Sequence, residues 1–307
     1  MKPLEGMSIG FIGLGLMGRP MSLNLREAGA RLVIHNRSRG VVDELAAQGM
    51  TAAGSARELA DLAPIVVLMV SDTSAVETVL FGEDGALHGL HPGALIIDMG
   101  TTEVMATRRF AQRAAQAGAE YVDAPVSGGQ VGAEEGALVI MAGGSASAVM
   151  RARPIFEVLG RRTTHVGSVG AGQVAKAANQ IIVGLTIGAV AEALTLARRA
   201  GVDPARVREA LAGGFADSRI LELHGQRMIE GRFDPGGKVV TQRKDLAQAL
   251  ALAQTLGLEL PAAHLNLALY DRLIAAGGGQ LDHSALIKVL EGTRDPDAEG
   301  PSPGRKS

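Results

Sequence analysis

The sequence contains no cysteine, no tryptophan, and only 2 tyrosines and 6 phenylalanines in 307 residues. The absence of cysteine excludes disulfides and cysteine catalysis, and it suits the reducing cytoplasm, where we expect the protein to act. Because aromatic residues are few, aliphatic side chains and methionine must build the cores. The formal net charge of −2 provides no basic field for binding nucleic acid or an anionic membrane, so we expect neither as a partner.

Long uninterrupted hydrophobic runs are also missing. The longest later run, from Ile181 to Ala197, contains Glu192 and is followed by Arg198 and Arg199. It is too short and too interrupted for a good membrane span, and we predict a buried helix instead. The apolar N-terminal stretch is short and broken by glycines, so we expect no signal peptide.

Over the first 167 residues, short apolar runs alternate with helical segments. We expect strands at 7–12, 31–35, 65–70, 94–100, 120–126, 137–144 and 163–167, with a shorter one between residues 49 and 55. The 41 glycines fit tight turns between strands and helices. This alternation predicts an α/β fold with a Rossmann-type doubly wound sheet in residues 1–167.

After residue 167 the pattern changes to long amphipathic segments with few strand signals. We predict an all-helical domain at 168–291, joined to the first domain by a long helix that begins near Gly172. The default ligand site is a cleft between the two domains. The polar tail 292–307, rich in proline and glycine, is expected to be disordered. The helical domain has more apolar faces than a lone domain needs, which favours a homo-oligomer.

A GxGxxG pattern at Gly13, Gly15 and Gly18 follows the first expected strand and precedes a helix expected from about Gly15 to Ala28. Such glycines allow a tight turn and a close approach of the backbone to a pyrophosphate, while the helix N-terminus offers N–H groups to the phosphates. The pattern therefore predicts a dinucleotide site. Its expected members here are Gly13, Leu14, Gly15, Leu16, Met17 and Gly18.

The acidic residue that usually follows the second strand of such a unit is absent. Asn36 occupies this place, 23 positions after Gly13, and Arg37 and Arg39 bring two cations. A guanidinium suits the 2′-phosphate of NADP, whereas an acid would accept hydrogen bonds from the ribose hydroxyl of NAD. We therefore expect Asn36, Arg37 and Ser38 to bind the cofactor, with NADP(H) preferred and NAD(H) possible.

Three further segments carry candidate chemistry. Met69, Val70 and Ser71 end another strand at the same edge of the sheet and are expected to line the cofactor ribose. Backbone N–H groups around Ser127, Gly128 and Gly129 can hold a carboxylate. Lys176 is expected on a largely buried helix, and its ammonium can protonate the alkoxide that hydride transfer to an aldehyde creates. No metal site is needed for this chemistry, and a lone histidine such as His283 is more often structural.

Four ordered motifs resemble one family. "GFIGLGLMGRPMSLNL", "DAPVSGGQVGAEEGALVIMAGG", "GAGQVAKAANQ" and "KDL" at 244–246 match motifs of the β-hydroxyacid (3-hydroxyisobutyrate) dehydrogenases, and the resemblance covers about residues 7–290. Within that family, "DHSAL" and the segment after Lys176 look most like the tartronate semialdehyde (2-hydroxy-3-oxopropionate) reductases. Members form dimers or tetramers, which the resemblance implies here too.

The resemblance also implies roles for single residues. Lys176 matches the general acid/base, and Ser127, Gly128 and Gly129 match the loop that binds the substrate carboxylate. Asn179 and Gln180 lie three and four positions after Lys176 and would orient the substrate; many relatives have Asn where this chain has Gln180. Thr101 and Lys244 match positions near the nicotinamide. We expect Asp123 to brace the carboxylate loop.

The resulting expectation is an NAD(P)-dependent oxidoreductase that interconverts a small hydroxy acid and its semialdehyde, with a small carboxylate as substrate. Tartronate semialdehyde, reduced to glycerate, is the leading candidate. Oxidation of 3-hydroxyisobutyrate, 4-hydroxybutyrate or threonate is the alternative, because the same loop and lysine would serve. A non-catalytic, NADP-binding regulatory protein is a remote alternative that would need neither.

Overall fold

The computed structural model describes residues 2–292. The chain divides into two compact units, one ending at Ala178 and the other beginning at Asn179. The boundary therefore lies inside the long helix α8 (Ala171–Arg199), whereas the sequence pattern changes earlier, at residue 167. Of the predicted disordered tail 292–307, all but Gly292 lies outside the described residues.

The first unit contains a sheet in the strand order β3-β2-β1-β4-β5-β6-β8-β7, with β9 beside β8. Strands β1 to β6 pair in parallel, whereas β8 is antiparallel to both β6 and β7. The strands are β1 (Ser8–Ile12), β2 (Arg31–His35), β3 (Thr51–Ala52), β4 (Ile65–Leu68), β5 (Leu95–Asp98), β6 (Glu120–Asp123), β7 (Val126–Ser127), β8 (Leu138–Gly143) and β9 (Gly160–Gly167).

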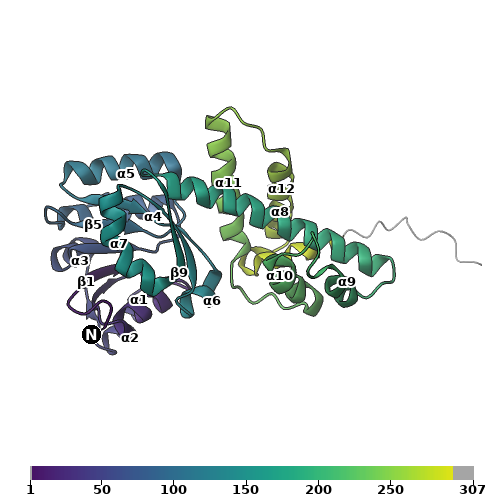
Figure 1. The fold of residues 1–307 in the computed structure, drawn as a ribbon, viewed down its shortest axis with the longest axis horizontal. Helices are drawn as coiled ribbons and strands as arrows, with labels where there is room; N and C mark the ends of the chain where they lie inside the picture. The colour runs from purple at the N-terminus through teal and green to yellow at the C-terminus, as the bar shows by residue number, and fades with distance from the viewer. Residues whose placement is uncertain (1, 293–307) are drawn as a thin grey trace, which may run out of the picture. The chain divides into compact units, whose positions relative to one another are not determined.

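Helices cover both faces of this sheet (Figure 1). One core joins the sheet to α1 (Gly18–Glu27), α2 (Arg39–Ala46) and α7 (Ala146–Leu159) through side chains such as Met21, Leu45 and Phe156. The other core joins it to α3 (Ala56–Leu62), α4 (Thr73–Phe81) and α5 (Val104–Gln116) through Leu59, Leu80 and Phe110. Both faces are apolar because successive strand residues alternate between two buried faces, which explains continuous apolar runs such as 65–68. The short helices η1 (Ala86–His88) and α6 (Gly129–Glu134) and the first residues of α8, up to Ala178, complete the unit.

Some predicted boundaries were wrong. The expected strand 120–126 is two strands, β6 and β7, separated by Ala124 and Pro125. Proline has no N–H to donate, so the parallel ladder of β6 stops there, and β7 pairs antiparallel with β8 instead. Helix α1 begins at Gly18 and not near Gly15, because the turn of the glycine motif extends to Met17. Strand β9 begins at Gly160, three residues before the expected start.

The second unit is helical, as predicted. Its elements are the rest of α8, then α9 (Pro204–Leu211), α10 (Arg219–Glu230), α11 (Val239–Thr255), α12 (Pro261–Ala275), η2 (Gly278–Gln280), η3 (His283–Leu286) and α13 (Ile287–Glu291). Leu194, Leu246, Tyr270 and Leu286 lie in its core. By length and composition α8 could cross a membrane, and 44% of the residues in its most apolar window are buried. A core helix of a soluble protein can have the same length and composition, so these properties of α8 are weak evidence for a membrane span.

Candidate active site

The glycine turn lies between β1 and α1, at the carboxyl end of the first strand. Gly13 has a φ of 98°, which favours glycine, and its N–H donates to the carbonyl of His35 at 3.1 Å. A Cβ at Gly13 would lie 2.3 Å from the carbonyl oxygen of Met69, and one at Gly18 would lie 1.8 Å from that of Gly13. Packing alone therefore requires glycine at both positions.

Gly15 differs, because neither its backbone nor its neighbours require glycine. A Cβ there would meet nothing within 4 Å, and its φ is not positive. The N-terminus of α1 beside it has no side-chain cap. The turn thus has two features. Gly15 leaves an open space that a side chain would begin to fill, and the N-terminus of α1 is available to bind an anion. Both features fit a dinucleotide pyrophosphate.

Asn36 has a role in the turn that sequence reasoning missed. Its Oδ1 accepts a hydrogen bond from the N–H of Leu14 at 3.0 Å, and its Nδ2 donates to the carbonyl of Ser38 at 3.1 Å. The side chain that replaces the usual acid therefore ties the glycine turn to the end of β2. Arg37 is exposed, whereas Arg39 forms an ion pair with Asp43 at 2.8 Å.

The other predicted cofactor residues follow β4 and β5 at the same carboxyl edge. Met69, Val70 and Ser71 come directly after β4, and the Met69 N–H donates to the carbonyl of Ile12 at 2.8 Å. Because β2 and β4 lie on opposite sides of β1, this edge is the topological switch point of the sheet. Open α/β sheets bind ligands at that point.

Thr101 lies in a loop that Asp98 anchors from the end of β5. The fully buried Asp98 carboxylate accepts hydrogen bonds from the N–H of Gly100 at 3.1 Å and from the Thr102 hydroxyl at 2.7 Å. The Tyr121 hydroxyl also donates to it at 3.1 Å. Burial, followed by the charge of Asp98, raises the pKa of Tyr121 well above its ordinary value. The loop is therefore held on a buried, hydrogen-bonded support.

The predicted carboxylate loop runs from the last residue of β7, Ser127, to the first residue of α6, Gly129. Gly128 and Gly129 have φ values of 138° and 62°, backbone conformations that residues other than glycine rarely adopt. Gly128 is exposed and Ser127 is half-buried. The loop thus presents backbone and a hydroxyl with no larger side chain in the way, which suits a small anion.

The structure brings Lys176 to this loop from fifty residues away in the chain. Its side chain lies early in α8 and is only 8% exposed. The ammonium Nζ donates to the carbonyl oxygen of Val126, next to Ser127, at 2.8 Å. A buried amine held beside a loop that suits a small anion could deliver a proton to a substrate bound there.

Asp123 holds the start of the helix that carries Lys176. Its Oδ1 accepts from the N–H of Gly170 at 2.7 Å, and its Oδ2 accepts from the N–H of Gln173 at 2.9 Å. Burial raises the pKa of Asp123 to about 7, although these two N–H groups act in the opposite direction. These bonds show that Asp123 caps α8.

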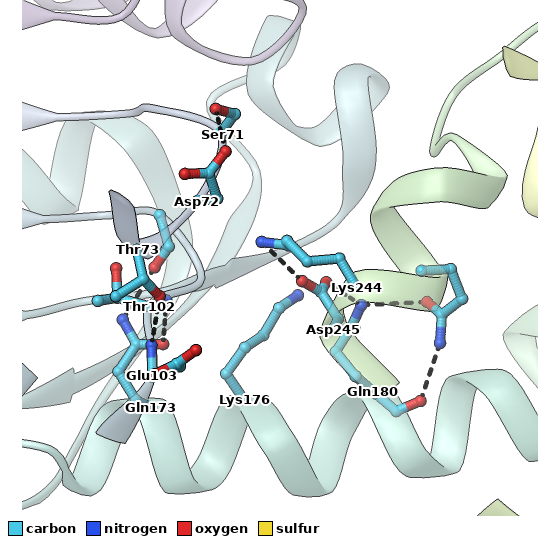
Figure 2. Close-up of polar contacts among 12 residues, drawn as sticks. Ser71, Asp72, Thr73, Thr102, Glu103, Gln173, Lys176, Gln180, Lys244 and Asp245 are labelled. Atoms are coloured by element: carbon cyan, nitrogen blue, oxygen red, sulfur yellow. Dashed lines mark hydrogen bonds and ion pairs between the residues drawn. The ribbon is translucent and has the colours of Figure 1, made fainter. Parts of the chain in front are cut away.

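The second unit holds Asn179, Gln180 and Lys244 in one polar cluster with Gln242 and Asp245. Figure 2 shows Gln180, Lys244 and Asp245 of this cluster. The Gln180 amide nitrogen donates to Asp245 Oδ2 at 2.6 Å and to Gln242 Oε1 at 3.1 Å, and its oxygen accepts from Asn179 Nδ2 at 2.7 Å. Lys244 forms an ion pair with Asp245 at 3.0 Å. Both hydrogens of the Gln180 amide are therefore engaged, and its oxygen accepts from Asn179, which leaves one lone pair of that oxygen for any further contact. Sequence reasoning missed Gln242 and Asp245, although "KDL" contains the latter.

His283 lies beside His224 and Asp282 in the second unit. The two Nε2 atoms are 3.3 Å apart, and His224 Nδ1 is 3.6 Å from Asp282 Oδ1. Both Asp282 oxygens already accept hydrogen bonds: Oδ1 from the Ser284 hydroxyl at 2.6 Å, and Oδ2 in an ion pair with Arg227 at 2.9 Å. We therefore interpret this cluster as structural and not as a metal site.

Comparison with known proteins agrees with these features. Residues 8–167 match the NAD-binding domain of 6-phosphogluconate dehydrogenase, and residues 170–290 match the NAD-binding family of NADP-dependent 3-hydroxyisobutyrate dehydrogenase. The chain is 49% identical to 2-hydroxy-3-oxopropionate reductase of Escherichia coli K12 over 93% of this chain and 97% of that protein.

Two solved structures extend the similarity. A 3-hydroxyisobutyrate dehydrogenase of Salmonella typhimurium is 30% identical with a TM-score of 0.84, and the match covers 92% of this chain and 99% of the other. Psf3, in complex with NADP+ and 2-OPP, is 26% identical with a TM-score of 0.84 and the same coverage. The chain belongs to the 3-hydroxyisobutyrate dehydrogenase family of NAD(P)-dependent oxidoreductases that act on hydroxy acids.

Proposed function

We propose that this protein is a 2-hydroxy-3-oxopropionate reductase, which reduces tartronate semialdehyde to glycerate and prefers NADPH. The observation that carries the chemistry is the buried Lys176 ammonium, held 2.8 Å from the Val126 carbonyl beside the Ser127–Gly129 loop. The 49% identity to the reductase of Escherichia coli supports this substrate over others in the family.

Residues of the first unit would bind the substrate carboxylate and transfer the proton. When bound, the nicotinamide supplies a hydride to the aldehyde carbon. The Ser127 hydroxyl and the N–H groups of the Ser127–Gly129 loop hold the substrate carboxylate. Lys176 Nζ then gives a proton to the carbonyl oxygen, which becomes the new hydroxyl group of glycerate. Lys176 serves as the base when the reaction runs in reverse.

The cofactor preference rests on the end of β2. Asn36 uses its side-chain oxygen to hold the N–H of Leu14, and it supplies no charge to a ribose hydroxyl. The exposed Arg37 next to it would donate charge-assisted hydrogen bonds to a 2′-phosphate. Gly13 to Gly18 would hold the pyrophosphate, while Met69, Val70, Ser71 and Thr101 would line the ribose and nicotinamide.

Oxidation of another small hydroxy acid is the second candidate. The structural similarity to a 3-hydroxyisobutyrate dehydrogenase favours it, because the carboxylate loop and Lys176 would serve that substrate equally well. A regulatory protein without activity is disfavoured, since it would need neither the buried lysine nor the loop.

We also expect a homo-oligomer, a dimer or tetramer, in the cytoplasm. Exposed apolar side chains on α8, including Ile182 at 64% and Leu196 at 71% exposure, support an interface between copies. Light scattering on the full chain measures the number of subunits.

The test of the function is a panel of semialdehydes and small hydroxy acids, each assayed with NADPH and NADH. We expect the highest kcat/KM with tartronate semialdehyde and NADPH. A higher value with 3-hydroxyisobutyrate would favour the second candidate, and no turnover of any compound would contradict both.

A further inference from the structure

Gln173 contacts the backbone on both sides of Thr101. Its Oε1 accepts from the N–H of Thr102 at 3.1 Å, and its Nε2 donates to the carbonyl of Gly100 at 2.9 Å. The amide thus makes the same pair of bonds that a neighbouring strand would make to a residue at position 101. Figure 2 shows Gln173 pointing from α8 toward Thr102.

The backbone of Gln173 is also held in place, by Asp123. Gln173 is 2% exposed, and its backbone N–H donates to Asp123 Oδ2 at 2.9 Å. A buried hydrogen-bonding group that loses its partner destabilises the fold, so these bonds hold the Gln173 amide in place. The residue therefore links the end of β5, through Gly100 and Thr102, to the end of β6, through Asp123.

Lys176 lies three residues after Gln173, on the next turn of the same helix and the same side. The Lys176 ammonium reaches the Val126 carbonyl, so the helix is held at both positions. A rotation or shift of α8 that moved the lysine would have to break the bonds of Gln173 to the Thr101 loop. The proton donor and the loop expected to contact the nicotinamide are thus mechanically joined through one amide.

We propose that Gln173 is a positioning residue for the reaction: it holds the Thr101 loop and the Lys176 helix in register, so that proton and hydride reach the substrate in the correct geometry. The inference rests on the proposed function, which gives Thr101 and Lys176 their roles. It adds a residue that touches neither substrate nor cofactor and acts through both sides of the site.

The test uses two variants of Gln173 in the full chain. Gln173→Met retains the length and packing but removes both hydrogen bonds. We expect kcat to fall at least tenfold, while the dissociation constant of NADPH, measured by fluorescence, stays within twofold. Gln254→Met, at an exposed position of α11, is the matched control and should leave kcat unchanged.

Gln173→Glu separates hydrogen bonding from volume. A protonated glutamic acid can donate to Gly100 and accept from Thr102, as glutamine does, whereas the ionised form cannot donate. We expect low kcat at pH 8 and recovery toward the wild-type value as the pH falls to 5.5. The wild-type profile is measured in parallel, because Asp98 and Asp123 face this site and Asp123 has a pKa of about 7.

A value of kcat for Gln173→Met within twofold of wild type, at a temperature where both are folded, would overturn the proposal. If the wild type turns over no compound in the panel, the proposed function fails, and reductive methylation of Lys176 then decides the inference by itself. Faster methylation in Gln173→Met, measured by mass spectrometry, would support the coupling, and an unchanged rate would contradict it.

Discussion

Loss of the Lys176 side chain should lower the rate of the chemical step without weakening cofactor binding. Lys176 is buried, and its ammonium lies beside the loop that we assign to the substrate carboxylate. We expect Lys176→Ala to lower kcat by about 10²–10⁴-fold, the usual contribution of a general acid. The dissociation constant of NADPH should change less than twofold. Lys288→Ala, at an exposed position, is the control, and near wild-type kcat in Lys176→Ala would contradict the mechanism.

Arg37 is the residue on which the proposed preference for NADPH depends. We expect Arg37→Gln to lower kcat/KM for NADPH by about tenfold to a hundredfold, the effect of losing a hydrogen bond to a charged group. The value for NADH should change little, because NADH has no 2′-phosphate. Arg31→Gln, at the other end of β2, provides the matched control. An equal fall in kcat/KM with both cofactors would show that Arg37 does not bind the 2′-phosphate.

Among the structural elements, the loop after β7 depends on its glycines. At Gly128 the φ is 138°, and a Cβ there would approach Leu138 Cδ2 to 3.2 Å. Gly128→Ala should therefore lower the free energy of unfolding by about 1–3 kcal/mol and raise KM for the substrate. Urea denaturation and steady-state kinetics measure the two effects. Gly40→Ala, where nothing lies within 4 Å and φ is not positive, should show neither.

The elements themselves could be read from the sequence where one periodicity dominates. Buried parallel strands such as β4 and β5 are continuous apolar runs, and the long helix α8 has an apolar core face. The interruption at Pro125 was missed, because the run 120–126 is apolar throughout its second half. The bonds of Gln173 could not be predicted, since a glutamine in a helix gives no sign of whether it faces solvent or a loop.

For the whole molecule, the buried carboxyl of Asp123 links folding to pH. Its pKa is about 7 in the folded protein and near 3.8 unfolded, so the folded state binds more protons between these values. Its contribution to stability is therefore fully present below pH 4 and is lost as the pH rises through 7. Compared with Asp123→Asn, the wild type should lose a few kcal/mol of unfolding free energy between pH 4 and 7. Urea titrations at several pH values measure the unfolding free energies of both proteins. A difference between them that does not change with pH would contradict the prediction.

Local patterns in the sequence were enough to predict the fold class and the glycine turn, and they selected Ser127, Gly128, Gly129 and Lys176 as candidate site residues. Each of these depends on a local pattern: strand and helix periodicity, glycine spacing, or a lysine in an apolar helix. The packing of the folded chain was needed to show that Asn36 holds the glycine turn, that Asp123 caps α8 and that Gln173 joins α8 to the Thr101 loop. Those contacts link residues 22, 47 and 71 positions apart. The distance between two side chains is fixed by how the strands and helices pack and not by the pattern of either segment.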